Sequence, residues 1–202
     1  MPKQSPTYSR EIASTGKERR SRNDTKRKRD FLEKALSPAV RSGRAGEELC
    51  YTQITMKIYL DACCLNRPFD DQGQPRVHLE TEAISLILEK LHRREWDWVG
   101  SEMLLYEISQ NPDLERRQRV LLFASQAKQV IETSDKILRR AEELEKSGFD
   151  TYDAIHLASA EQAGVDVFLT TDDQILKVTN RNKKFLPFLV ENPVKWLEEV
   201  LK

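Results

Sequence analysis

The stretch Ile58-Tyr59-Leu60-Asp61 contains a short apolar run, with a β-branched and an aromatic residue, that ends at an acid. Unbroken apolar runs of this length are typical of strands that are buried on both faces of a sheet. We therefore predict a buried strand over residues 58–60 with Asp61 at its carboxyl end. Similar runs predict four further strands, over residues 96–100, 129–131, 167–170 and 188–190.

Helical patterns fill the segments between these strands. Residues 79–91 carry apolar side chains at helical spacing, and further helices are predicted after residues 101, 113 and 134, over 151–163 and from 193 onward. Ser101 and Ser134 are typical N-cap residues, and Gly164 is a typical helix end. Strands that alternate with helices indicate a parallel sheet covered on both faces. The predicted fold class is therefore a three-layer α/β/α sandwich with a mainly parallel central sheet of about five strands.

The first 55 residues differ from the rest in charge and composition. They hold 13 Lys and Arg against 7 Asp and Glu, which leaves 20 and 26 of the chain totals of 33 and 33 for residues 56–202. The net charges of the two segments are thus +6 and −6. Residues 1–55 have few large apolar side chains, so we expect a disordered basic extension with a short candidate helix near 30–36.

The basic run at residues 26–29 of this extension has three interpretations. A solvated tail is the simplest, and a nucleic-acid contact is the functional alternative. The third is that the natural start is Met56, immediately before the first predicted core strand. In each case residues 56–202 are expected to form the folded domain.

Composition argues against several classes of protein. No apolar run approaches the roughly 20 residues that a membrane helix needs, and the N-terminus lacks the apolar core of a secretory signal. Cys50, Cys63 and Cys64 fit a reducing compartment rather than a disulfide framework, and the scattered histidines give no zinc spacing. We expect a cytoplasmic protein without a membrane partner.

Four acidic residues are predicted to meet at one edge of the sheet. Asp61 and Asp172 follow the first and fourth strands, while Glu107 and Asp153 lie on helices at the same edge. Ligands of open α/β sheets bind outside the carboxyl ends of the strands. Converging carboxylates repel one another, and a hard divalent cation reverses that repulsion, so one or two Mg²⁺ or Mn²⁺ ions are expected. Such a site suits phosphodiester hydrolysis.

Each of these acids taken alone has a simpler interpretation. An Asp at a strand end, such as Asp61 or Asp172, is often a cap or turn residue. Glu107 alone suggests a surface charge, and Asp153 a helix N-terminal charge. The metal site is therefore predicted from the four acids together and from none of them singly.

Four segments resemble the motifs of PIN-domain proteins. These segments are Ile58–Asp70, Ser101–Ile108, Tyr152–Ala160 and Phe168–Asp173. Their order and spacing resemble the family pattern over residues 56 to 190. The resemblance implies a PIN-like fold and a Mg²⁺- or Mn²⁺-dependent ribonuclease.

The resemblance also implies roles for single residues. Asp61 and Asp153 would be core metal ligands, Glu107 a further ligand or water-positioning group, and Asp172 the fourth acid. Thr170 would support the site by hydrogen bonding. The spacing from Thr170 favours Asp172 as the ligand, which leaves Asp173 as a supporting residue or a helix cap.

The resemblance further suggests partners. Many bacterial PIN-domain proteins are toxins of VapC-type toxin–antitoxin pairs, and many dimerise. It therefore implies an RNA substrate, a cognate antitoxin protein and a homodimer.

Other side chains near the predicted site have open roles. Asn66 and Arg67 lie in a predicted loop after the first strand, Asn66 as a supporting residue and Arg67 as either a phosphate contact or a structural ion pair. Arg116 and Arg117 either line an RNA groove or belong to a solvated helix face. His156 lies three residues after Asp153; we interpret it as packed or hydrogen-bonded, with a supporting role at the site as the alternative.

The leading hypothesis is a metal-dependent endoribonuclease that cuts single-stranded or structured RNA as the toxin of a toxin–antitoxin pair. The alternative is a catalytically silent RNA- or protein-binding module on the same fold, and the complete set of four acids argues against it. A phospho-accepting receiver domain would need a Lys after the fifth strand, where this chain has Glu191-Asn192-Pro193.

Overall fold

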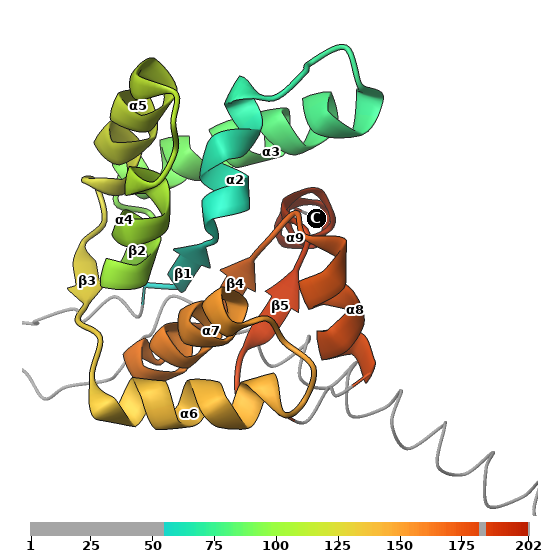
Figure 1. Ribbon diagram of the computed structural model, residues 1–202. Coiled ribbons are helices and arrows are strands. Elements are labelled where there is room, and N and C mark those ends of the chain that lie inside the picture. The colour runs from blue at the N-terminus through green and yellow to red at the C-terminus, as the bar shows by residue number, and fades with distance from the viewer. Residues whose placement is uncertain (1–54, 182–184, 202) are drawn as a thin grey trace, which may run out of the picture. The chain divides into compact units, whose positions relative to one another are not determined.

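The structure is a computed structural model that describes residues 55–181 and 185–201 (Figure 1). The expected disordered extension over residues 1–55, with its candidate helix near 30–36, therefore lies almost entirely outside the described residues. The domain boundary at residue 56 stays a prediction.

The centre of the fold is a five-stranded sheet in which every neighbouring pair of strands is parallel. Its strands are β1 Lys57–Leu60, β2 Asp97–Ser101, β3 Gln129–Ile131, β4 Val167–Leu169 and β5 Leu189–Glu191. Their order across the sheet is β3-β2-β1-β4-β5. The predicted parallel sheet and the positions of its strands are confirmed to within one or two residues.

The helices follow the predicted alternation. They are α2 Ala62–Asn66, the 3-10 helix η1 Arg67–Phe69, α3 Pro75–His92, α4 Glu102–Ser109, α5 Leu114–Ala124, α6 Asp135–Glu145, α7 Thr151–Ala163, α8 Asp173–Arg181 and α9 Pro193–Val200. The side chains of Ser101 and Ser134 accept the capping bonds predicted from the sequence, and Gly164 ends α7 in the left-handed conformation. Among the described helices, none is long and apolar enough to cross a bilayer.

Two predicted boundaries were wrong. The expected loop after the first strand is helical, because Asp61 caps α2 and Pro68 occupies the first turn of η1. A helix of five residues is too short to display a helical period in the sequence. Helix α3 begins at Pro75 rather than at residue 79, since proline is favoured in the first turn of a helix.

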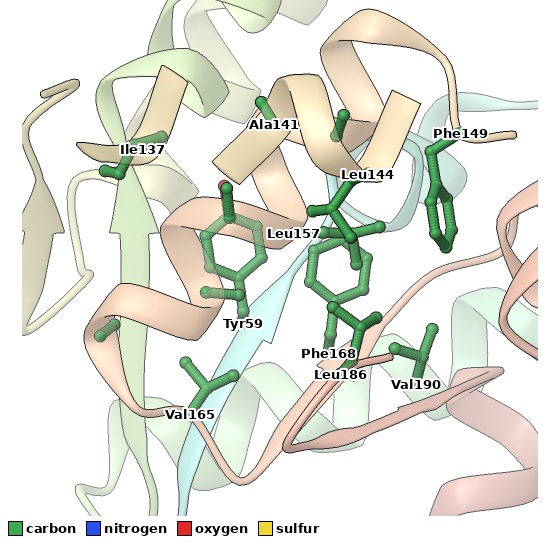
Figure 2. Packing of buried hydrophobic residues seen from close by; sticks show 14 of the residues in the cluster. Tyr59, Ile137, Ala141, Leu144, Phe149, Leu157, Val165, Phe168, Leu186 and Val190 are labelled. Atoms are coloured by element: carbon green, nitrogen blue, oxygen red, sulfur yellow. The ribbon is translucent and has the colours of Figure 1, made fainter. Parts of the chain in front are cut away.

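Helices α6 and α7 pack against one face of the sheet. Tyr59 lies opposite Val99 and Phe168 in the strand register, so these side chains share that face. They are buried with Ile137 and Leu144 of α6 (Figure 2). Tyr59 and Phe168 stack with ring centroids 5.1 Å apart.

Helices α3 and α9 pack together and belong to the opposite face. Ile58 and Trp98 are paired in the register and alternate with Tyr59, so they point away from α6 and α7. Trp196 of α9 is fully buried and meets Trp96 edge to face at 5.0 Å. The predicted three-layer sandwich is confirmed.

The carboxyl edge of the sheet contains a topological switch point between β1 and β4. From β1 the chain proceeds to β2 and β3 on one side, and it later returns to β4 and β5 on the other. The backbone N–H of Asp61 donates to the carbonyl of Leu169 at 3.0 Å, so the two strand ends lie side by side. Ligands of open α/β sheets bind at such a point.

A buried ion-pair network braces this edge. Glu80 of α3 is 2% exposed, and its carboxylate accepts from Arg76 Nε at 2.9 Å and from Asn192 Nδ2 at 2.8 Å. Arg67 Nε lies 2.9 Å from its other oxygen. Arg76 also donates two bonds, of 2.6 and 2.7 Å, to Asp173 at the start of α8. The network therefore joins η1, α3, α8 and the turn before α9.

We predict that Glu80→Ala lowers the free energy of unfolding by about 3–5 kcal/mol, because it leaves two guanidinium groups without their buried partner. Urea denaturation followed by tryptophan fluorescence measures this loss. Glu115→Ala is the matched control, since Glu115 forms an exposed pair with Arg119 and should lose less than about 1 kcal/mol. Equal losses in the two variants would show that Glu80 does not brace the fold.

Candidate metal centre

Asp61 is the most buried of the four predicted site acids and is held by three donors. Its Oδ1 accepts from the backbone N–H of Ala62 at 2.8 Å, which caps α2. Its Oδ2 accepts from the hydroxyl of Thr170 at 2.7 Å and from the Cys63 thiol at 3.0 Å. Only 5% of Asp61 is exposed. These bonds fix the orientation of its carboxylate.

Thr170 also joins Asp61 to the segment after β4. Its hydroxyl oxygen accepts from the backbone N–H of Asp172 at 3.0 Å while its hydrogen is donated to Asp61. The Asp172 carboxylate accepts from the backbone N–H of Gln174 at 2.6 Å. Asp173, by contrast, is mostly exposed and is held by Arg76. The two adjacent acids thus have different surroundings.

Asp153 lies in the first turn of α7. This helix follows Asp150 and runs antiparallel to β4, so its first turn reaches the carboxyl edge. Burial, followed by the neighbouring carboxylates of Asp61, Asp172 and Asp150, raises the pKa of Asp153 to about 7. The charge on Asp153 therefore interacts directly with two of the other predicted site acids.

Glu107 lies in the second turn of α4 and is anchored by a buried histidine. Its Oε2 lies 2.8 Å from Nε2 of His156, which is 1% exposed. Burial alone would lower the pKa of His156, but the bond to Glu107 and the carboxylates of Asp61 and Asp153 outweigh it and raise the pKa. One oxygen of Asp61, one of Glu107 and one nitrogen of His156 lie within 4.8 Å of one another.

The acidic cluster, meaning Asp61, Glu107, Asp153 and Asp172, offers oxygen ligands, and His156 contacts its Glu107. Among the described residues, no Lys or Arg forms an ion pair with any of the four. The buried Glu80, by contrast, is paired with two arginines. Four carboxylates without an arginine or lysine partner fit Mg²⁺ or Mn²⁺, which prefer oxygen ligands.

The basic residues predicted near the site are engaged with protein groups. Arg67 pairs with Asp70 and Glu80, and Arg116 pairs with Asp70 and donates to the side chain and backbone of Asn66. Arg117 donates to the carbonyl of Asn111. The structure therefore shows protein partners for Arg67, Arg116 and Arg117, and their contact with RNA stays a prediction.

Sequence reasoning did not single out Tyr59 or Cys63, and it preferred the simpler interpretation of His156. Tyr59 Oη lies 2.7 Å from Nδ1 of His156, and the Cys63 sulfur contacts both Asp61 and Thr170. The spacing of His156 from Asp153 was the one available signal. The contacts of Tyr59 with His156 and of Cys63 with Thr170 join residues 97 and 107 positions apart, so no local pattern indicates them.

A parallel α/β domain with acidic side chains at its switch point belongs to the open α/β folds whose ligands bind at the carboxyl edge of the sheet. The sequence model of the PIN domain matches residues 58–181, which is more than half of the chain. The chain belongs to the PIN-domain family, whose members are generally nucleases.

Other comparisons add less. A search of curated proteins found no significant match. Among solved structures, the VapBC2 complex from Rickettsia felis bound to a DNA fragment from its promoter contains a chain with a TM-score of 0.46 and 18% identity. The alignment covers 68% of this chain and 98% of that one. The family assignment rests on the sequence match alone.

We predict that a divalent cation stabilises the protein more at about pH 8 than at about pH 5.5. The pKa of Asp153 is raised to about 7, so the folded protein keeps this proton after the unfolded chain has lost it, and the metal-free protein loses stability as pH rises from about 4 to 7. A cation binds the deprotonated carboxylate of Asp153. It therefore restores the lost stability at the higher pH, where this carboxylate is deprotonated, and not at the lower pH.

Thermal unfolding with Mn²⁺ or with EDTA at the two pH values measures this difference. Asp153→Asn is the control: it should reduce the Mn²⁺-dependent rise in Tm and remove its pH dependence. A rise that is equal at both pH values in the wild type would contradict the proximity of Asp153 to the cation.

Proposed function

We propose that this chain is a Mg²⁺- or Mn²⁺-dependent endoribonuclease that hydrolyses phosphodiester bonds at the acidic cluster. The observation that carries the proposal is the convergence of four carboxylates, without an arginine or lysine partner in the described part of the chain, at the switch point of a PIN-family domain. RNA as the substrate is inferred from the resemblance of its motifs to those of PIN-domain ribonucleases.

In this proposal Asp61, Asp153, Glu107 and Asp172 hold the cation. A bound divalent cation supplies charge that polarises a phosphoryl oxygen and lowers the pKa of water. The protein supplies orientation: Thr170 and the start of α2 fix Asp61, and His156 holds one oxygen of Glu107. The other oxygen of Glu107 is then available to a ligand or to the attacking water.

An acidic domain must bind a polyanion by means other than its net charge. Tyr106 and Tyr152 directly precede Glu107 and Asp153, and they are 50% and 48% exposed. Their rings meet edge to face with centroids 6.3 Å apart. Exposed aromatic rings stack unpaired bases, and this contribution does not depend on phosphate charge. We infer that the tyrosine pair holds a base of single-stranded RNA beside the cluster.

We predict that Tyr106→Ala and Tyr152→Ala each weaken binding of a single-stranded RNA about 5- to 100-fold, the range expected for the loss of one stacked base. Fluorescence anisotropy in an Asp61→Asn background measures binding without cleavage. Leu86→Ala removes an equally exposed apolar side chain from α3 and serves as the control. Unchanged affinity in both tyrosine variants would remove the pair from the substrate site.

The direct test of the nuclease proposal is cleavage of a labelled single-stranded RNA by the purified full-length chain. We expect cutting with Mn²⁺ or Mg²⁺, none with EDTA, and a loss of at least about 100-fold in Asp61→Asn with its fold intact, because that change removes the most buried ligand charge. Cutting that persists in EDTA and in Asp61→Asn would contradict the proposed site. Tight metal binding without cutting of any RNA would favour the silent binding module.

The role as a toxin with a cognate antitoxin and the homodimeric state are proposed from the same motif resemblance. The wild-type and Asp61→Asn proteins test both. Induced wild-type protein should arrest bacterial growth and the variant should not, while light scattering should give twice the mass of the chain for each. Growth that is unaffected by an active nuclease would remove the toxin role and leave the enzyme.

A further inference from the structure

Four polar side chains form one continuous chain of hydrogen bonds beneath the acidic cluster. Ser101 Oγ lies 2.6 Å from Tyr59 Oη, Tyr59 Oη lies 2.7 Å from His156 Nδ1, and His156 Nε2 lies 2.8 Å from Glu107 Oε2. The residues come from β2, β1, α7 and α4 in turn. Ser101, Tyr59 and His156 are at most 1% exposed, so the chain is sealed from water up to Glu107.

The direction of each bond follows from the number of protons. Ser101 Oγ accepts from the backbone N–H of Leu104 at 3.1 Å and keeps its own hydrogen for donation to Tyr59 when the tyrosine hydroxyl donates onward to His156. Burial raises the pKa of Tyr59, which keeps its hydroxyl protonated and able to donate to Nδ1 of His156. The hydrogen of a neutral His156 then lies on Nε2 and is donated to the Glu107 carboxylate.

Protonation of His156 does not change the contact with Glu107. With hydrogens on both ring nitrogens, the Nδ1–H donates to Tyr59 and the tyrosine hydroxyl turns to Ser101. The Nε2–H still faces the carboxylate. A nitrogen that carries a hydrogen has no lone pair for a cation, so His156 does not bind a metal while this chain of bonds is intact, although it lies within 4.8 Å of ligand oxygens of Asp61 and Glu107.

We propose that His156 is a positioning residue for Glu107: it holds Oε2 so that Oε1 is presented to the cation that Asp61 also binds. The proposal rests on the proposed function, since it assumes a cation in the acidic cluster. Tyr59 and Ser101 extend the same role, because they fix the tautomer and the plane of the imidazole ring.

The position of Glu107 explains why an anchor is needed. Its side chain is 40% exposed and extends from the second turn of α4, so an unanchored carboxylate would sample several rotamers. Holding one oxygen in advance reduces the conformational entropy lost when a cation binds. Partners of this kind, which touch a ligand residue but not the metal, typically change metal affinity 10- to 100-fold. Ser101 is also the N-cap of α4, so one network fixes both the start of the helix and its carboxylate.

The test compares the Mn²⁺ dissociation constants of full-length variants, measured from free Mn²⁺ by electron paramagnetic resonance. His156→Asn places its amide near Nδ1 and loses the donor to Glu107, whereas His156→Gln reaches the position of Nε2 and retains it. Tyr59→Phe removes only the hydroxyl and keeps the stacking on Phe168. Thermal unfolding in EDTA records the folding of each variant separately.

We expect His156→Asn to weaken Mn²⁺ binding about 10- to 100-fold, Tyr59→Phe to weaken it less, and His156→Gln to stay within about threefold of the wild type. Glu107→Gln should weaken binding as much as His156→Asn does. The double variant Glu107→Gln/His156→Asn should be no weaker than Glu107→Gln alone, because both changes remove one interaction.

Four results would overturn the proposal. Additive losses in the double variant, with no rescue by His156→Gln, would make His156 a metal ligand. A lower Tm with unchanged Mn²⁺ affinity in His156→Asn would make its role purely structural. Absence of Mn²⁺ binding by the wild type would remove the proposed function and this inference together, whereas binding that depends on Glu107 but not on His156 would remove the inference alone.

Discussion

Repulsion among four carboxylates is the constraint on which this structure depends. The fold brings acids from four separate segments to one edge of a parallel sheet, where Asp61 is buried and the other three are partly buried. Hydrogen-bond donors offset the cost at Asp61, and a buried histidine does so at Glu107. Burial, together with the charges of the neighbouring carboxylates, raises the pKa of Asp153 to about 7. A cation that binds the charged form of this carboxyl group would lower that pKa again.

A comparison of Asp61 with Glu80 supports the interpretation of the acidic cluster as a cation site. Both Glu80 and Asp61 are buried acids at the carboxyl edge of the sheet. Glu80 is paired with Arg67 and Arg76 and serves to join helices, whereas Asp61 is given neutral donors. The arginines are used to brace the fold around the edge of the sheet. A fold that leaves a place for a metal and still holds the ligands rigidly requires this difference, in which arginines pair with Glu80 and neutral donors bind Asp61.

Much of the fold could be predicted from the sequence, because it rests on local signals. Apolar runs gave the five strands, and cap residues such as Ser101 and Gly164 gave the helix ends. Helix α2 was missed because it is shorter than two turns and begins at the acid that was assigned to the site. The bonds of Tyr59 to Ser101 and His156 span 42 and 97 positions, so they depend on strand order and helix packing, which no local pattern contains.

We propose above all that the acidic cluster holds a divalent cation. Anomalous X-ray diffraction from crystals of the protein soaked in Mn²⁺ tests this proposal most directly. We expect an anomalous peak at about 2.0–2.3 Å from oxygens of Asp61 and of at least one of Glu107, Asp153 and Asp172, with His156 still donating to Glu107. No peak at saturating Mn²⁺, or a peak bound through His156 Nε2, would contradict it.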